Sequence, residues 1–281
     1  MGMLYLCATP IGNLSDMSPR IIETLKQVDL IAAEDTRNSI KLLNHFEIHT
    51  PMTSYHEYNK VEKAYTLIEK IKQGADVALI TDAGTPAISD PGEVLVKMCQ
   101  EAGIAVTSLP GPVACITALT LSGLATRRFC FEGFLPADKK ERMEVLEDLK
   151  QEKRTILFYE APHHLKKTLL LLYETLGERK ITICRELTKK FETVMPTTLA
   201  DALLYYETNE PRGEYVLVLE GKAKEEIEAE RQKSFEEMPI EDHVEQYEKQ
   251  GFDHKEAMKK VAKDRGITKR DVYQYLLNIK K

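Results

Sequence analysis

Two polar clusters hold the residues best suited to acid–base chemistry, and each directly follows an apolar run. They occupy residues 34–37 (Glu-Asp-Thr-Arg) and 185–190 (Arg-Glu-Leu-Thr-Lys-Lys). Burying such groups without partners costs on the order of several kcal/mol, so each cluster either faces solvent or lines a cleft. In a cleft, a carboxylate of the first cluster accepts a proton and Arg37 holds a phosphate. The alternative is structural: Asp35 or Asn38 caps a helix, and Arg37 pairs with Glu34 or Asp35.

Three loops combine a rigid proline with a glycine that lets the backbone approach a ligand closely. They lie at residues 9–14, 81–86 and 110–112. One such loop alone is typical of an ordinary turn. Three at predicted strand ends favour a ligand site, because open α/β sheets bind ligands at the carboxyl ends of parallel strands. The GxxxxGK[ST] and GxGxxG signatures of ATP and NAD sites are missing, as are HExxH and paired-cysteine zinc patterns, so we expect no metal site.

Short apolar runs alternate with helical patterns over the first 222 residues and position these loops. Strands are predicted at residues 3–8, 29–33, 76–81, 104–109, 129–135, 154–159, 180–185 and 213–220. Helices are predicted between them, including one that Ser18 caps and Pro19 begins. This alternation predicts the α/β class with a largely parallel sheet, in two domains at residues 1–122 and 123–222.

The last 58 residues change abruptly in charge. Residues 224–253 hold 4 Lys and Arg against 11 Asp and Glu, and predict a charged helical linker at 223–253. Residues 254–281 hold 9 Lys and Arg against 3 Asp and Glu, and Gly266 and Thr268 fit a turn and a helix cap between two helices. Helix-turn-helix spacing and a basic charge favour RNA binding, while a plain helical hairpin is the alternative. The predicted phosphate contacts are Lys259, Lys260, Lys263, Lys269 and Arg270.

Composition narrows the class of protein. The chain has 281 residues, 43% hydrophobic and 30% charged, with a net charge of −6, which is typical of a globular protein. The longest apolar runs have the length of strands, so we expect no membrane span and no membrane partner. Five widely spaced cysteines and no recognisable signal peptide favour buried thiols in the cytoplasm.

Nine motifs in this order resemble one protein family. They are ATPIGNLSD, AAEDTR, TSYHEYN, ALITDAGTPAISDPG, SLPGP, FEGFLP, FYEAPHHL, RELTKKFE and PRGEYVLVLEG. The chain resembles the tetrapyrrole methylase superfamily, the class III S-adenosylmethionine methyltransferases. Within it, the combination of EDTR with DAGTPAISDPG is similar to the bacterial branch of ribosomal RNA small subunit methyltransferases I, which methylate a cytidine 2′-hydroxyl of 16S RNA.

The resemblance implies a function and a set of partners. It implies two α/β domains with S-adenosyl-L-methionine in the cleft between them, and a homodimer. It also implies that the chain methylates the ribose of a decoding-region cytidine in small-subunit ribosomal RNA, with the assembled subunit as the expected substrate. Two positions depart from the family pattern: His164 replaces the usual Arg, and Val113 replaces the usual Ser.

Site residues follow from the resemblance together with the clusters above. The expected cofactor-binding residues are Gly12, Asp82, Gly84, Thr85, Ile88, Ala114, Tyr159, Leu187 and Gly213. Asp82 is expected near the ammonium of the cofactor, and the apolar members along its adenine. The expected catalytic residues are Glu34, Asp35, Arg37, Glu186 and Lys189. Tyr55 and His56 join Arg37 as expected RNA contacts.

The identity of the general base stays open at this point, with Glu34, Asp35, Glu186, Lys189 and His56 as candidates and the first cluster preferred. Two other functions also stay open. One is a small-molecule, tetrapyrrole-like methylase of the same fold, and the other is a non-catalytic RNA-binding module. The basic tail and the EDTR segment argue against the first, and the intact glycine- and proline-containing loops argue against the second.

Overall fold

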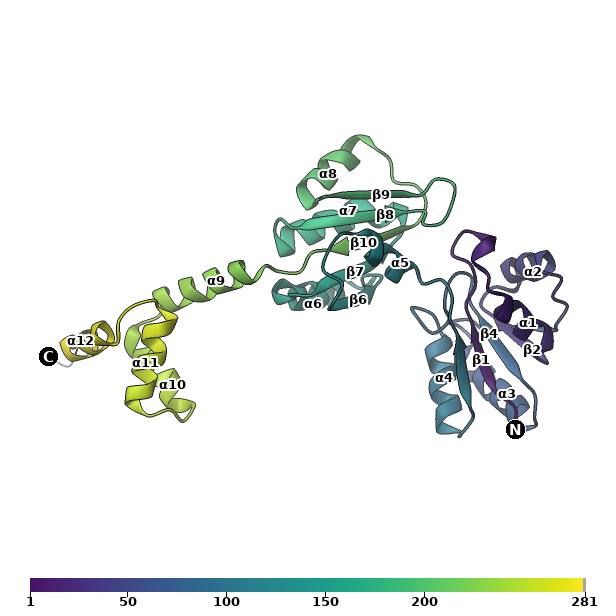
Figure 1. Ribbon diagram of the computed structural model, residues 1–281, viewed down its shortest axis with the longest axis horizontal. Coiled ribbons are helices and arrows are strands. Elements are labelled where there is room, and N and C mark those ends of the chain that lie inside the picture. The colour runs from purple at the N-terminus through teal and green to yellow at the C-terminus, as the bar shows by residue number, and fades with distance from the viewer. Residues whose placement is uncertain (280–281) are drawn as a thin grey trace. The chain divides into compact units, whose positions relative to one another are not determined.

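The computed structural model describes residues 1–279, except for the side chains of Glu236 and Ile279. Its contacts divide the chain into two compact units, and we describe each by itself. The first unit comprises residues 1–149 and 154–220 and contains two five-stranded sheets (Figure 1). The second comprises residues 150–153 and the chain from Gly221 onward.

The first sheet is parallel throughout, in the order β3-β2-β4-β1-β5. Its strands are β1 (Leu4–Cys7), β2 (Leu30–Ala33), β3 (Met52–Ser54), β4 (Val77–Ile80) and β5 (Val106–Leu109). The connecting helices are η1 (Leu14–Asp16), α1 (Pro19–Gln27), α2 (Thr36–His45), α3 (Lys60–Lys72) and α4 (Gly92–Glu101). The predicted α/β class is confirmed here, and the side chain of Ser18 caps α1 as expected.

Helices cover both faces of the first sheet, because side chains alternate along each strand. Leu4 and Leu6 of β1 pack with apolar residues of α3 and α4. Cys7 and, on β4, Ala78 and Ile80 pack with α1 and α2 instead. This two-sided packing leaves the carboxyl edge of the sheet as the place where polar loops emerge.

The second sheet has the order β6-β7-β10-β8-β9. Its strands are β6 (Phe129–Gly133), β7 (Thr155–Glu160), β8 (Lys180–Arg185), β9 (Thr193–Thr198) and β10 (Tyr215–Leu219). Only β6 and β7 pair in parallel, and the other three pairings are antiparallel. The expectation of a largely parallel sheet is therefore wrong for this half. The short 186–192 loop returns the chain as a β8–β9 hairpin, and the sequence analysis did not identify β9.

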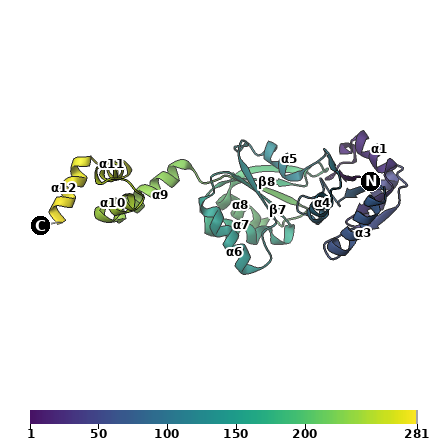
Figure 2. The same ribbon diagram turned by 90° about the horizontal axis from the view of Figure 1, so that it is seen from below.

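Helices flank the second sheet on both faces. They are α5 (Ala114–Leu121), α6 (Lys139–Asp148), η2 (Leu149–Gln151), α7 (Pro162–Leu176) and α8 (Leu199–Thr208). Residues of α6, α7 and α8 share one core with the sheet, and α5 packs on the opposite face (Figure 2). Since α5 packs against β7 and β10, the chain passes from the first sheet to the second near residues 110–113, ahead of the predicted boundary at residue 122.

The second unit is built from α9 (Lys224–Glu237), α10 (Ile240–Lys249), α11 (His254–Asp264) and α12 (Lys269–Ile279). A small apolar core joins α10, α11 and α12, so α10 belongs with the two predicted helices and not with the linker alone. Gly266 turns the chain between α11 and α12 with φ +64°. Thr268 and Asp271 then exchange side-chain-to-backbone bonds, which is the capping box that begins α12.

A polar network fixes α10 against α11. The Nε of Arg265 donates to Nδ1 of His243 at 3.2 Å, and the hydroxyl of Tyr247 donates to Asp264. The His243 ring stacks on Phe235, with 4.2 Å between the ring centroids. Burial, reinforced by the charge of Arg265, lowers the pKa of His243.

Candidate active site

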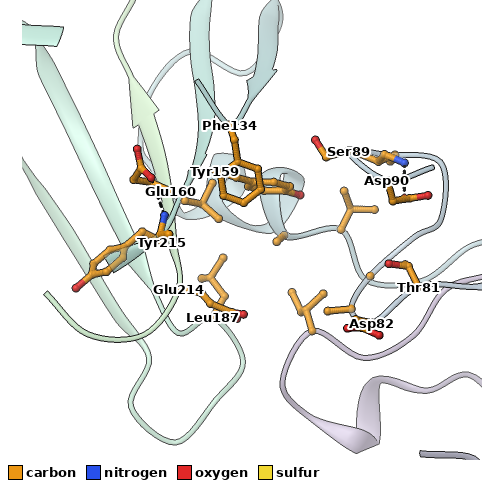
Figure 3. A pocket seen from close by; sticks show the side chains of 18 of the residues that line it. Thr81, Asp82, Ser89, Asp90, Phe134, Tyr159, Glu160, Leu187, Glu214 and Tyr215 are labelled. Atoms are coloured by element: carbon orange, nitrogen blue, oxygen red, sulfur yellow. Dashed lines mark hydrogen bonds between the residues drawn. The ribbon is translucent and has the colours of Figure 1, made fainter. Parts of the chain in front are cut away.

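A cavity of about 590 Å³ opens at the carboxyl edge of the first sheet and is bounded on the other side by the second sheet. This volume is in the range of small-molecule sites. Seven of the nine predicted cofactor residues line it: Asp82, Gly84, Thr85, Ile88, Ala114, Tyr159 and Leu187. Figure 3 shows Thr81 and Asp82 on one side, with Tyr159 and Phe134 on the other.

Two glycine-containing loops are joined to each other at the floor of this cavity. The backbone of Gly84 donates to the carbonyl of Thr9 at 3.1 Å and accepts from its amide at 2.9 Å. The Thr9 hydroxyl also donates to the carbonyl of Thr81 at 3.0 Å. Gly84 has φ +88°, which favours glycine. Its own polar groups are therefore used to hold the β1 and β4 loops together, and the amides of Ala83 and Thr85 have no protein partner within residues 1–279.

Asp90 shapes the loop that follows. Its carboxylate accepts bonds from the amides of Ala87, Ile88 and Gly92, at 3.0, 3.0 and 2.7 Å. Ala87 and Ser89 both have positive φ, at 69° and 62°, a conformation that is strained for residues other than glycine. The Asp90 carboxylate compensates for this strain and fixes the cavity wall at Ile88.

Carboxylates dominate the side of the cavity formed by the first sheet. Glu34 follows β2, and its Oε2 accepts from the Thr81 hydroxyl at 2.7 Å. Asp82 follows β4 and accepts from the Asn38 side chain at 3.2 Å. Burial raises the pKa of Asp82, and the neighbouring Glu34 charge raises it further, despite the bond from Asn38. An excess of negative charge at this side suits a cationic ligand.

The other members of the first predicted cluster lie beside the cavity. Asp35 caps α2, and Arg37 makes two side-chain bonds to it, at 2.7 and 3.1 Å. The bond from Arg37 lowers the pKa of Asp35 to about 2. The structural alternative, a helix cap with an ion pair, is therefore present. The Arg37 side chain is nevertheless 88% exposed, so its guanidinium remains accessible to a ligand.

Comparison with known proteins decides the family. Residues 3–203 match the family model described as Tetrapyrrole (Corrin/Porphyrin) Methylases. The chain belongs to the tetrapyrrole methylase family. It is 49% identical over 97% of its length to the ribosomal RNA small subunit methyltransferase I of Bacillus subtilis, of which 93% is covered. It is 47% identical to the protein of that name from Synechocystis sp., over 99% of each chain. The match to the one from Haemophilus influenzae is 53% identical and covers 79% of this chain and 80% of that one.

Solved structures of tetrapyrrole methylase fold show the same architecture at low identity. Diphthine synthase superposes with a TM-score of 0.63 and 14% identity, over 78% of this chain and 90% of that one. The uroporphyrin-III C-methyltransferase of Thermus thermophilus gives a TM-score of 0.55 and 17% identity, over 78% and 94%. Together these comparisons confirm the predicted fold class, the methyltransferase class and S-adenosylmethionine as the cofactor.

The cavity of this tetrapyrrole methylase fits that cofactor. S-adenosylmethionine is a cation with an apolar adenine. The cavity has Glu34 and Asp82 at the first sheet and apolar side chains, together with Glu160 and Glu214, at the second. Asp82 would hold the ammonium, and the free amides of Ala83 and Thr85 would hold the methionine carboxylate. Leu187 and Tyr159 belong to the apolar side, and Tyr159 is fixed by a bond from the Cys115 amide at 3.3 Å.

Glu186 and Lys189 form a compact ion cluster at the mouth of the 186–192 loop. Lys189 Nζ lies 2.9 Å from Glu186 Oε1 and 2.7 Å from Glu214 Oε2. Although partial burial acts in the opposite direction, these bonds raise the pKa of Lys189. They lower the pKa of Glu186, although partial burial acts in the opposite direction there too. The raised pKa favours the ammonium form of Lys189, which cannot accept a proton, and the lowered pKa makes the Glu186 carboxylate a weaker base.

Gly12 and Gly213, the remaining two predicted cofactor residues, pack against this ion cluster and do not line the cavity. A Cβ at Gly12 would lie 2.4 Å from Lys189 Cγ, and one at Gly213 would lie 2.6 Å from the Glu186 carboxyl group. Both glycines therefore allow a close approach of backbone to side chain. Only Gly213 directly precedes a residue of the cavity lining, Glu214. The sequence analysis did not predict Glu214 as a site residue.

Tyr55 and His56, the other two expected RNA contacts, differ in how accessible they are. Tyr55 is 1% exposed and its hydroxyl donates to the Pro91 carbonyl at 3.0 Å, so in this structure it is a core residue, against the prediction. His56 is half-buried and contacts the Asn59 side chain at 3.3 Å. Both fall outside the cavity lining, and neither is placed to act on a ligand there.

The family departures have local consequences. Val113 is the N-cap residue of α5 and makes no side-chain cap bond, where a serine would supply one. It also lines the cavity, which makes this wall more apolar. His164 is exposed near the start of α7, beside His163.

The tail residues lie in the second unit. Lys259, Lys263, Lys269 and Arg270 are exposed on α11 and α12. Lys260 is half-buried, with Nζ 4.2 Å from the Phe252 ring centroid, so its charge is partly used inside the unit. Among residues 1–279, no helix is both long and apolar enough to cross a bilayer, and no group of three His, Cys, Asp or Glu side chains is arranged to hold a metal ion.

Proposed function

We propose that this chain transfers a methyl group from S-adenosylmethionine to the ribose 2′-hydroxyl of a decoding-region cytidine in small-subunit ribosomal RNA. The observation that carries the proposal is the carboxylate pair Glu34 and Asp82 at the first sheet, opposite a cavity wall that includes the apolar side chains of Leu187 and Val216. The names of relatives 47–53% identical to the chain support ribosomal RNA as the substrate.

The two carboxylates take different roles. When bound, S-adenosylmethionine supplies an electrophilic methyl group and leaves as the neutral thioether. The ribose oxygen forms the new bond to this methyl carbon, and its proton passes to Glu34. The Thr81 hydroxyl fixes Oε2 of that side chain, while Oε1 has no protein partner among the described residues and is free to accept the proton. Asp82 remains the counter-ion of the cofactor.

Positioning supplies most of the rate. Holding two reactants in line removes roughly 7–11 kcal/mol of the barrier in favourable cases. Here the rigid elements are the Thr9–Gly84 backbone pairing and the Asp90 loop, which fix the cavity before ligands arrive. We therefore expect little rearrangement of these loops when the cofactor binds.

RNA is held by cations outside the cavity. Arg37 is exposed next to Glu34 and is the expected phosphate contact near the reacting ribose. The exposed cations of α11 and α12 supply further phosphate contacts. We also propose a homodimer, a cytoplasmic location and the assembled small subunit as the substrate, in keeping with the family resemblance.

The test uses undermodified small ribosomal subunits and free small-subunit RNA with methyl-labelled S-adenosylmethionine. Mass spectrometry of ribonuclease digests should place the label on one cytidine ribose, and E34Q should remove the transfer. Label on a base, or on no RNA at all, contradicts the proposal. Label on a tetrapyrrole or an amino acid derivative offered in parallel would support the small-molecule alternative.

A further inference from the structure

Phe134 is a solvent-exposed aromatic residue in the cavity lining. It lines the cavity, yet 57% of it is accessible, which is unusual for a phenylalanine next to a buried apolar wall. Figure 3 shows its ring beside Tyr159, across the cavity from Asp82. The residue therefore lies where a ligand enters from solvent.

A break in β6 directs Phe134 to this position. The pairing of β6 with β7 shifts register between Phe131 and Gly133, and Gly133 has φ +63°. Irregularities of this kind re-aim side chains next to active sites. The positive φ favours glycine at this position, and a Cβ there would lie 3.0 Å from the hydroxyl of Ser89, so any larger residue would also have to displace that side chain.

The Phe134 ring is supported from behind and open in front. Its edge contact with Tyr159 has 5.7 Å between ring centroids, and Phe131 contacts Tyr159 from another side at 4.9 Å. The hydroxyl of Tyr159 is held by the Cys115 amide. A rigid wall thus fixes one side of Phe134 and leaves the rest of the ring to a ligand.

The position of Phe134 separates the two aromatic ligands of the proposed reaction. The adenine of the cofactor suits the enclosed part of the cavity, where Leu187 and Val216 are each 6% exposed. The substrate nucleotide arrives from outside and must bring its ribose to Glu34. Its base then lies nearer the opening, where the exposed ring is.

We propose that Phe134 is the stacking surface for the base of the nucleotide whose ribose is methylated. The inference rests on the proposed function and adds a requirement to it: the target base must leave its stack, as RNA-binding proteins commonly require of the bases they recognise. The chain therefore acts on an unpaired or opened segment of RNA.

The test compares F134A, F134L and F134Y on undermodified subunits. Loss of a base stack costs roughly 5- to 150-fold in binding, so kcat/KM should fall by that factor in F134A. F134L keeps an apolar side chain without a ring and should fall nearly as far, whereas F134Y should stay within about threefold of wild type. F129A is the matched control, since Phe129 is 38% exposed on β6, the strand that directly precedes Phe134, and lies outside the cavity lining.

Three readouts decide against the inference. A parallel rise in the S-adenosylmethionine dissociation constant of F134A assigns the ring to the adenine. Wild-type activity in F134L reduces its role to apolar packing. A changed mass in light scattering assigns it to an interface between copies. If wild-type protein fails to methylate ribosomal RNA, the proposed function fails first, which separates the two outcomes.

Discussion

Neutralising the exposed cations of α11 and α12 should weaken RNA binding and reduce its dependence on salt. The variant is K259A/K263A/K269A/R270A, which keeps Lys260 because that ammonium contacts the Phe252 ring. All four altered side chains are exposed, so each substitution should change stability by no more than about 0.5 kcal/mol.

The size of the effect follows from the number of phosphates released. Each contact contributes about 0.7 to 0.9 units to the slope of log affinity against log salt, so losing four contacts lowers the slope by about 3 units. Between about 50 and about 200 mM salt, wild-type affinity should therefore fall about 50- to 150-fold more than that of the variant. S-adenosylmethionine affinity should stay unchanged, because no altered residue lines the cavity.

The assay is equilibrium binding to small-subunit RNA at four or more salt concentrations. A matched variant, K26A/K70A/K72A/K97A, removes the same number of exposed charges from the first unit and controls for net charge. An equal loss of slope in both variants would refute a local contact. An unchanged slope with a lowered melting temperature would show that the second unit only stabilises the protein.

Three further predictions concern the cavity. E34Q should lower the single-turnover rate by about 10²- to 10⁴-fold with an unchanged cofactor dissociation constant, and a parallel rise in that constant would assign Glu34 to cofactor binding instead. D82N should weaken binding of S-adenosylmethionine but not of methylthioadenosine, which lacks the ammonium. Because the pKa of Asp82 is raised, the affinity of the wild-type protein for S-adenosylmethionine should begin to fall at a higher pH than it would with an aspartate of ordinary pKa. Calorimetry over a range of pH should show a flatter affinity profile for D82N. R37A should lose RNA methylation, keep its melting temperature, and move the NMR titration midpoint of Asp35 from about 2 toward the ordinary value of about 3.9, whereas an unmoved midpoint would remove Arg37 as the cause of the shift.

Local sequence signals were sufficient for much of the site. The loops after β1 and β4 were predicted because a glycine and a proline follow short apolar runs, and parallel strands bring such ends together. What the pattern did not contain is the direct pairing of Thr9 with Gly84, which uses the polar groups that were expected to bind a ligand. That pairing joins residues 75 positions apart and depends on the register of the sheet.

Non-local packing explains the remaining differences. Tyr55 has polar neighbours in sequence, and only the approach of Pro91 supplies the buried carbonyl that satisfies its hydroxyl. Phe134 lies within the strand predicted at residues 129–135, but β6 ends at Gly133, where the irregular pairing leaves Phe134 exposed. The antiparallel half of the second sheet depends on β10 inserting between β7 and β8. Local hydrophobic periodicity does not predict this strand order.

The central place of β10 also sets when this protein can become functional during its synthesis. Its neighbours β7 and β8 are complete by Arg185, but their shared partner ends only at Leu219. At about 5–20 residues per second, the ribosome needs roughly 2–7 s to make the intervening segment, and both strands expose unpaired edges for that time. Val216 of β10 is also part of the cavity wall. A nascent chain that ends before β10 therefore has an incomplete cavity, and cofactor binding cannot stabilise it. Chaperones can bind the unpaired strand edges during that interval.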